Sequence, residues 1–437
     1  MSYSQRLAER EARTGRPVRV GILGAGQMGS GLIAQVHRAR GMEVVAVADI
    51  AVERAEKALA DAGRTDVVRA EDIAGAARAI EDGHAAVLQD GMRLADLPLD
   101  IVVEVSGVPD VAAQIAMSCL LAGTDVALMT VEADVTVGLL LARIAGSGNA
   151  IYTVCRGDEP VECVKLIEYA EDLGLEVVVA GKGKNNPMRP TDTPADVAEE
   201  AERKGMNPKM LTSFTDGTKT QIEMAALANA TGYRVEVPGM HGAAVDVRDL
   251  AEVLRPVTLG GIVESDGPVV EYVTGDAAPG VFVIARSDND VVTHELQYLR
   301  LPGVDDHFAL YRPYHLASIE APLSIGEAII ERRPSFQAST WTADVIATAK
   351  SDLPADTVLQ GIGGDHVHGT AIDAEEARDQ NLLPIGLAAS SRLLRDVAAG
   401  AYLTYDDVEL DESRPLVAMR RLQDALLGTG VIEGVNR

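Results

Sequence analysis

The glycine pattern near the start of the chain constrains the fold more than any other feature. The apolar run Val18–Leu23 leads directly into Gly24, Gly26 and Gly29, which have the spacing GxGxxG. A helical pattern follows, and then a second apolar run that ends at Asp49, 20 residues after the last glycine. This order of strand, glycine loop, helix, strand and acidic residue is typical of a Rossmann-type nucleotide-binding domain.

Each residue of this pattern has an expected task if the segment binds a dinucleotide. The first glycine permits a tight turn, the second lets the backbone approach a pyrophosphate, and the third lets the helix pack close to the strand. Gln27 and Met28 open a helix whose unpaired N–H groups attract phosphates. Asp49 is expected to accept hydrogen bonds from a ribose, which favours NAD, whereas Arg54 is an alternative partner for the 2′-phosphate of NADP. The sequence leaves the choice open.

Two later segments, 100–123 and 125–148, repeat the order of strand, turn and helix. Ligands of such sheets bind beyond the carboxyl ends of the strands. We therefore expect four residues near the nicotinamide: Ser106, Gly107, Val131 and Glu132. Residues 61–99 are alanine-rich, and we expect them to form a helical insertion.

The charge of the chain limits its partners. The 437 residues are enough for two or three domains, and they carry a formal net charge of −27. This charge argues against nucleic acid, and an anionic substrate would need a locally positive pocket. The three cysteines lack disulfide or metal spacing, residues 1–16 predict a charged amphipathic helix, and no apolar run has membrane-spanning length. We expect a cytoplasmic protein that binds neither nucleic acid nor membrane.

The segment VVVAGKGKNNP contains the strongest signal outside the glycine loop. A β-branched run ends in Lys182 and Lys184, which alternate with glycines, and Asn185 and Asn186 follow. Two lysines are suited to a phosphate, and a lysine of lowered pKa can act as a general acid on a carbonyl oxygen. The alternative is a solvated turn.

A second group of polar residues opens the next helical segment. Asp216 precedes Lys219, and Glu223 lies four positions further on the same helical face. On a helix otherwise rich in alanine and methionine, this pair is suited to handling a proton. The alternative is a salt bridge on the surface.

Two shorter motifs remain ambiguous. Arg156 precedes Asp158 and Glu159, and the two acids either cap the helix that follows or take part in the site. Tyr314 and His315 lie in an aromatic cluster that forms either a substrate wall or a domain core.

The segment 392–410 resembles the end of a SAF domain, a small β-clip module. With the preceding motifs in place, most of the chain resembles the DXR-like (DRL) oxidoreductase family. The segments that carry this resemblance are YTVCRGDEP, GKGKNNP, SFTDGTKTQIEMAALANATG and YRPYHL. It implies an α/β chain of three parts: a Rossmann-type, homoserine-dehydrogenase-like domain (1–150), an α+β catalytic and oligomerisation domain (151–345) and a SAF-like β-clip domain (346–437).

The resemblance also implies an activity. The characterised activity in this family is that of a reductoisomerase of isoprenoid biosynthesis. It converts 1-deoxy-D-xylulose 5-phosphate to 2-C-methyl-D-erythritol 4-phosphate with NADPH and a divalent metal (Mn²⁺ or Mg²⁺). Asp49 departs from the NADPH preference. Two rivals are a homoserine-dehydrogenase-like or other polyol or hydroxy-acid dehydrogenase, and a cofactor-binding sensor without turnover. By analogy with enzymes of this architecture we expect a homodimer or homotetramer.

Residue type and spacing assign candidate roles for this chemistry. The candidate catalytic residues are Lys184, Lys219, Glu223 and Asp216. The candidate substrate ligands are Arg156, Lys182, Asn185, Asn186, Tyr314 and His315. The candidate metal ligands, chosen because hard cations prefer carboxylates, are Asp158, Glu159 and Glu223.

Overall fold

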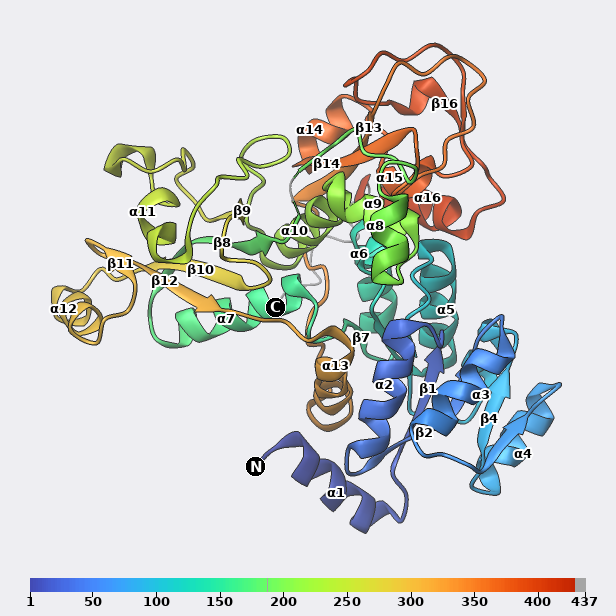
Figure 1. Cartoon of the computed structure of the whole chain (residues 1–437). Helices are drawn as coiled ribbons and strands as arrows, with labels where there is room; N and C mark the ends of the chain where they lie inside the picture. The colour runs from blue at the N-terminus through green and yellow to red at the C-terminus, as the bar shows by residue number, and fades with distance from the viewer. Residues whose placement is uncertain (187, 429–437) are drawn as a thin grey trace. The chain divides into compact units, whose positions relative to one another are not determined.

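The computed structural model describes residues 1–186 and 188–428, and the chain forms two compact units (Figure 1). Unit 1 consists of Met1–Val161, Leu316–Gln337 and the segment from Ala418 onward. Unit 2 consists of Glu162–His315 and Ala338–Val417. The predicted three-part division cuts the chain differently after residue 161, and it stays a prediction.

Unit 1 contains a seven-stranded sheet in the order β3-β4-β2-β1-β5-β6-β7, and every neighbouring pair is parallel. Its strands are β1 (Val18–Leu23), β2 (Met42–Ala48), β3 (Val67–Arg69), β4 (Ala85–Leu88), β5 (Ile101–Glu104), β6 (Asp125–Leu128) and β7 (Tyr152–Val154). The helices that follow the strands are α2 (Gln27–Arg38), α3 (Val52–Asp61), α4 (Ile73–Glu81), α5 (Pro109–Ala122) and α6 (Val131–Ser147). The connections diverge between β1 and β5, and this is where ligands bind in such sheets. The expected Rossmann-type fold is confirmed.

The alanine-rich segment 61–99 differs from the expectation of a helical insertion. It contains β3, α4, β4 and the 3₁₀ helix η1 (Gly91–Asp96). Both strands extend the sheet beyond β2. The four residues of β4 are all buried, so a short alanine-containing run can serve as a strand once tertiary packing covers it.

Later parts of the chain complete unit 1. The predicted first helix is α1 (Tyr3–Thr14), which begins with a capping box of Ser2 and Gln5. Helix α13 (Ala317–Gly326) packs against α2 (Figure 1) and runs into a π-helical turn, η4 (Glu327–Glu331). The chain then passes beside β7, where the N–H of Val154 donates to the carbonyl oxygen of Phe336 at 2.9 Å.

Helix α16 (Pro415–Gly428) begins in unit 2 and ends in unit 1. Its Gln423, which is 2% exposed, inserts its amide into α6. The amide accepts a hydrogen bond from the N–H of Leu140 and donates one to the carbonyl oxygen of Thr136. The side chain thus replaces a backbone hydrogen bond inside the helix.

Unit 2 contains a five-stranded mixed sheet in the order β11-β12-β10-β8-β9. The strands are β8 (Glu176–Lys184), β9 (Val269–Thr274), β10 (Val281–Arg286), β11 (Gly303–Val304) and β12 (His307–Arg312). Only the pair of β8 and β9 is parallel among the described strands of this sheet. Helix α7 (Glu159–Asp172) begins in unit 1 and continues in unit 2. The other helices of this part are α8 (Ala198–Lys204), α9 (Pro208–Thr215), α10 (Thr218–Thr231), α11 (Leu250–Val253) and α12 (Asp290–Tyr298), with 3₁₀ turns η2 (Val247–Asp249) and η3 (Val257–Leu259).

The last part of unit 2 is a β-hairpin followed by short elements. The hairpin is β13 (Ala343–Ala349) and β14 (Val367–Asp373). The short elements are α14 (Ala374–Asp379), α15 (Ile385–Ala388), β15 (Arg392–Leu393), η5 (Tyr405–Asp407) and β16 (Val408–Glu409). These elements agree with the expected small β-rich region, and the assignment to a SAF domain stays a prediction.

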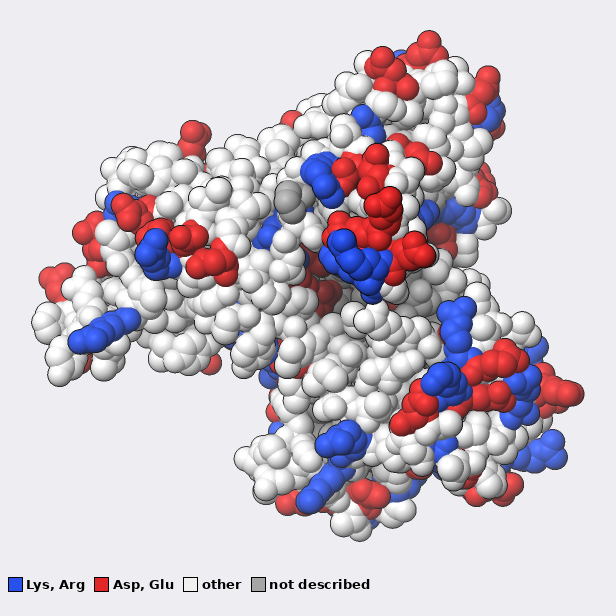
Figure 2. Space-filling view, in the orientation of Figure 1, with Lys and Arg blue, Asp and Glu red and all other residues white. Residues whose placement is uncertain are grey.

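The surface carries charges of both signs. On the face drawn in Figure 2, basic side chains are interspersed with acidic ones. The three cysteines are free and buried. Within the described residues, no helix is both long enough and apolar enough to cross a bilayer.

Asn229 of α10 holds the start of the hairpin. Its carboxamide accepts hydrogen bonds from the N–H groups of Thr342 and Ala343 and donates to the carbonyl oxygen of Ala343, at 2.9 to 3.0 Å. The side chain is 3% exposed. Its loss would leave buried backbone groups without partners, and each such group costs about 1–3 kcal/mol.

We predict that Asn229→Ala lowers the free energy of unfolding by about 2–4 kcal/mol, measured by denaturant unfolding. Gln380→Ala is the matched control, because this residue is exposed and its amide donates to the side chain of Glu376 in α14, at the surface. Equal stability of the two variants would contradict the prediction.

Candidate functional site

The glycine loop of unit 1 has the geometry that a dinucleotide requires. Gly24 has φ +104°, and a Cβ there would lie 2.9 Å from the carbonyl oxygen of Val105. A Cβ on Gly29 would lie 2.1 Å from the carbonyl oxygen of Gly24, so only glycine lets α2 pack here. At Gly26 a Cβ would meet nothing within 4 Å, so this part of the loop is open.

The first turn of α2 is suited to an anion. Gly26 is the N-cap and supplies no side-chain cap to the helix N–H groups. Gln27 and Met28 are exposed. Because uncapped N–H groups and the helix dipole favour negative charge, the loop fits a pyrophosphate.

Asp49 lies directly after β2 and is fixed by the backbone. Its Oδ2 accepts a hydrogen bond from the N–H of Ala25 at 2.8 Å, and its Oδ1 accepts one from the N–H of Ala51 at 2.8 Å. Arg54 lies 4.0 Å away, with a side chain that is 60% exposed. The carboxylate therefore joins the glycine loop to the end of β2, where an adenosine ribose binds in this fold.

The turn after β5 is supported by Glu104, which sequence reasoning missed. This residue is fully buried, and its Oε1 accepts hydrogen bonds from the N–H of Ser106 at 2.6 Å and its hydroxyl at 2.5 Å. The N–H of Gly107 donates to Oγ1 of Thr130 at 3.1 Å. Burial raises the pKa of Glu104, with the nearby charge of Glu132 acting in the same direction. An acid that ends the apolar run IVVE was the available signal.

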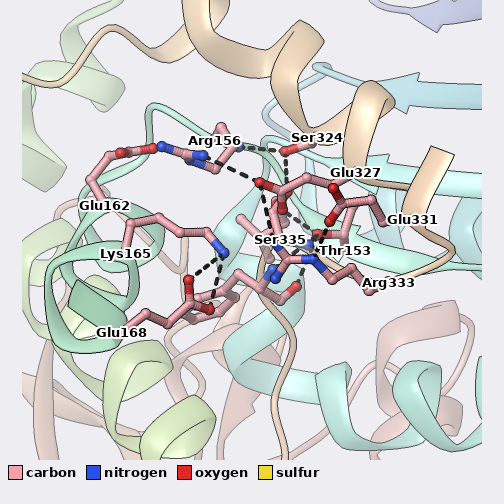
Figure 3. A network of polar contacts seen from close by, with 12 residues as sticks. Thr153, Arg156, Glu162, Lys165, Glu168, Ser324, Glu327, Glu331, Arg333 and Ser335 are labelled. Carbon is pink, nitrogen blue, oxygen red and sulfur yellow. Dashed lines mark hydrogen bonds and ion pairs between the residues drawn. The ribbon is translucent and has the colours of Figure 1, made fainter. Parts of the chain in front are cut away.

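Arg156 forms polar contacts with other residues of unit 1, and Figure 3 labels Ser324 and Glu327 among them. Its N–H donates to Oγ of Ser324 at 2.7 Å, and its guanidinium lies 3.3 Å from Glu327, whose side chain is 3% exposed. A Cβ on the neighbouring Gly157 would come within 2.8 Å of the backbone of Leu316 and Ala317. These contacts fix the turn against α13, and a substrate role for Arg156 stays a prediction.

In unit 2 the motif GKGK forms the end of β8, and its glycines and lysines face opposite sides of the sheet. A Cβ on Gly181 would lie 1.8 Å from the carbonyl oxygen of Glu271, and one on Gly183 would lie 2.3 Å from the backbone of Ala277. The glycines thus permit close backbone packing on one side. Lys182 and Lys184 lie together on the other side and are 7% and 5% exposed.

Lys182 forms a buried ion pair with Glu223 of α10. Lys219, one turn earlier on the same helix, lies 3.8 Å from the other oxygen of Glu223. The side chains of Glu223 and Lys219 are 2% and 17% exposed. The expected Lys219–Glu223 pair is therefore present and largely buried, and the alternative of a surface salt bridge is wrong.

Lys184 is held so that part of its ammonium group remains available. It donates to the carbonyl oxygens of Asn186 and Phe214, both at 2.8 Å. These are two of the three N–H donors of an ammonium group, and within the described residues no third acceptor bonds it. Burial, and next the charge of Lys182, lowers the pKa of Lys184 to about 8.

Asp216 is completely buried between α9 and α10. Its Oδ1 accepts a hydrogen bond from the N–H of Thr218, and its Oδ2 lies 2.9 Å from Nζ of Lys350. Lys350 follows β13 and was missed from the sequence, because a lysine after an apolar run carries no signal that distinguishes it from a surface residue.

The remaining residues predicted from the sequence are more exposed than the buried lysines. Asn185 is exposed, and Asn186 contributes its carbonyl oxygen to Lys184. Tyr314 is 49% exposed and lies against the guanidinium of Arg312, 4.8 Å from the ring centre. His315 is half-buried. Their substrate roles stay predictions.

The three predicted metal ligands belong to different units. Asp158 and Glu159 are in unit 1, and Glu223 is in unit 2. Their role as a metal site stays a prediction.

A comparison with protein families supports the middle of the chain. Residues 157–321 match the family described as oxidoreductase DRL, catalytic domain. The match includes the lysines of β8, helix α10 and Tyr314, and it covers less than half of the chain. Together with the nucleotide-binding fold, it supports an NAD(P)-dependent oxidoreductase. No curated protein matches the chain.

Solved dehydrogenases share only a distant likeness. A probable dehydrogenase from Thermotoga maritima is 12% identical, with 72% of this chain and 90% of that chain covered, at a TM-score of 0.42. A myo-inositol 2-dehydrogenase from Lactobacillus plantarum is 13% identical, with 73% and 91% covered, at 0.39. A myo-inositol dehydrogenase from Corynebacterium glutamicum is 13% identical, with 67% and 75% covered, at 0.38. These values are too low to support an argument about activity.

We predict that Lys182→Met raises the pKa of Lys184. The positive charge of Lys182 lowers this pKa, and its removal also leaves Glu223, which raises it, less neutralised. The measurement is a ¹³C NMR titration of lysine-labelled protein, with Lys184 assigned from Lys184→Arg. Lys57→Met, an exposed lysine of unit 1, is the control. An unchanged or lower pKa would contradict the electrostatic account.

Proposed function

We propose that the chain is an NAD(P)H-dependent oxidoreductase that reduces the carbonyl group of a phosphorylated, polyoxygenated substrate. The observation that carries the proposal is Lys184, a buried lysine of lowered pKa whose ammonium uses only two of its three N–H donors on the described residues. It lies in the segment that matches an oxidoreductase catalytic domain, in a chain that also has a dinucleotide-type fold.

The charge distribution supports an anionic substrate. The whole chain carries a net charge of −27, yet four lysines gather around α10: Lys182 and Lys219 lie beside Glu223, Lys350 pairs with Asp216, and Lys184 lies near Lys182. Ammonium groups in such a buried cluster can bind a phosphate or carboxylate even though the protein as a whole is acidic. This favours a sugar phosphate over a neutral polyol.

Each residue of the site has a task in carbonyl reduction. Bound NAD(P)H would supply the hydride. The free N–H of Lys184 would donate to the carbonyl oxygen and transfer its proton as the alkoxide forms, and solvent would then reprotonate the amine. Lys182 and Lys219 would contact the anionic end of the substrate, while Glu223 holds both lysines in place.

The finer proposal is a reductoisomerase acting on 1-deoxy-D-xylulose 5-phosphate or a related ketose phosphate. Its support is the matched catalytic domain together with the lysine site. Skeletal rearrangement would use a divalent cation, for which Asp158, Glu159 and Glu223 are the candidate ligands. A simple dehydrogenase would need no metal for its chemistry, so metal dependence separates the two reactions.

We predict that the protein binds NADH more tightly than NADPH, because the fixed carboxylate of Asp49 accepts hydrogen bonds from ribose hydroxyls and repels a 2′-phosphate. Asp49→Ala should weaken NADH binding by about tenfold or more and reduce the preference for NADH. Cofactor fluorescence titration measures both constants. Asp61→Ala, an exposed carboxylate of α3, is the control. Tighter binding of NADPH by the unaltered protein would overturn this assignment and point to Arg54.

We predict that Lys184→Ala lowers kcat by about 100-fold or more and leaves the Kd of NADH unchanged, because it removes the proton donor of unit 2 and nothing of unit 1. Turnover that requires protonated Lys184 should fall as the pH rises through about 8. The assay is cofactor oxidation with a panel of ketose and aldose phosphates, including 1-deoxy-D-xylulose 5-phosphate, with aspartate semialdehyde as the rival substrate.

Each assay is run with and without Mn²⁺. Metal-dependent turnover of the deoxypentulose phosphate supports the reductoisomerase. Turnover of another sugar phosphate instead would change the proposed substrate and leave the proposed site and reaction class in place. Turnover of aspartate semialdehyde supports the simple dehydrogenase. Cofactor binding without turnover of any compound would overturn the enzymatic proposal.

A further inference from the structure

The C-terminal hairpin is hydrogen-bonded to the helix that carries the candidate catalytic residues. Within unit 2, the N–H of Gly369 in β14 donates to Oγ1 of Thr218 at 2.8 Å, and the N–H of Ala371 donates to Oε1 of Gln221 at 2.9 Å. Asn229, two turns later on α10, bonds the start of β13. Three buried polar side chains of one helix thus serve as acceptors for the backbone of the hairpin.

Lys350 forms the charged part of the same contact. Its Nζ lies 2.6 Å from the carbonyl oxygen of Asp192, 2.7 Å from that of Gly364 and 2.9 Å from Oδ2 of Asp216. These three oxygens equal the number of N–H groups of an ammonium, and the side chain is 1% exposed. Lys350 therefore has no donor left for a substrate, in contrast to Lys184.

The partner of Lys350 links it to the candidate proton donor. Asp216 is fully buried, and its charge acts on Lys184 from the corner between α9 and α10. A buried carboxylate is held in one place by its partners, because an unpaired charge in a low-dielectric interior is costly. Removal of Lys350 would leave the full charge of Asp216 to act on Lys184.

We propose that the C-terminal hairpin is an integral part of the lysine site: Lys350 and strand β14 hold the α9–α10 corner, and Lys350 is a positioning residue that sets the field of Asp216 at Lys184. The inference rests on the proposed function of Lys184 and gives the C-terminal region a role in catalysis. If the C-terminal region were instead a separate arm for binding a partner, altering its contacts would leave the lysine site unchanged.

The test compares the titration of Lys184 in three variants of the full chain. In Lys350→Met the uncompensated Asp216 stabilises the ammonium form of Lys184, so the alkaline limb of the kcat profile should move to higher pH. In Asp216→Asn the carboxylate is lost while the charge of Lys350 remains, so the limb should move to lower pH. We expect opposite shifts of about half a pH unit or more.

Lys209→Met is the matched control. Lys209 of α9 also bonds the C-terminal region, through the carbonyl oxygen of Gln360 at 2.9 Å, but it is exposed, whereas Lys350 is buried against Asp216. It should leave the limb in place. If Lys350→Met does not fold, Lys350→Gln, which is uncharged and still donates to carbonyl oxygens, takes its place.

A second readout separates this inference from the proposed function. A ¹³C NMR titration reports the ionisation of Lys184 without turnover, so the opposite shifts remain measurable even if every substrate assay fails. Opposite shifts support the positioning role. A common loss of activity with an unmoved titration, or shifts of the same sign in the two variants, would overturn it and reduce Lys350 to a structural ion pair.

Discussion

Burial of positive charge is the constraint on which the organisation of unit 2 depends. An ammonium group taken out of water must be surrounded by oxygens, or its charge is lost. Helix α10 and its surroundings supply those oxygens in three ways: Glu223 for Lys182, two carbonyl oxygens for Lys184, and two carbonyl oxygens with Asp216 for Lys350. Among the described residues, Lys184 has two such oxygens and can still donate to a substrate, whereas Lys350 has three and can only hold the fold.

The same constraint explains why sequence-distant segments converge on α10. Strand β8 brings the two lysines, the turn before α10 brings Asp216, and the residue after β13 brings Lys350. Polar side chains of the helix then bond the backbone of the hairpin. A helix with so many buried polar groups is held in one position, and it thereby keeps Glu223 in place beside Lys182 of β8.

In unit 1 the candidate cofactor site is shaped by close contacts between backbone segments and not by buried ion pairs of lysine. The glycine loop leaves room for an anion because side chains are absent where β5 and α2 come near. Asp49 and Glu104 then fix the two turns by accepting backbone N–H groups. Acidic residues can therefore shape a site that is expected to bind a negatively charged cofactor, because their carboxylates accept hydrogen bonds from backbone N–H groups.

The sequence by itself determined the nucleotide-binding fold, its glycine loop and Asp49, because each of these depends on residues close together along the chain. It also indicated Lys182, Lys184, Asp216, Lys219 and Glu223, since lysines at the end of an apolar strand and an i, i+4 pair are local patterns. Only the tertiary structure revealed β3 and β4, Glu104 and Lys350, and showed that glycines beside the lysines serve backbone packing. The physical reason is that burial and pairing of a charge depend on partners far away in sequence, and local pattern carries no information about them.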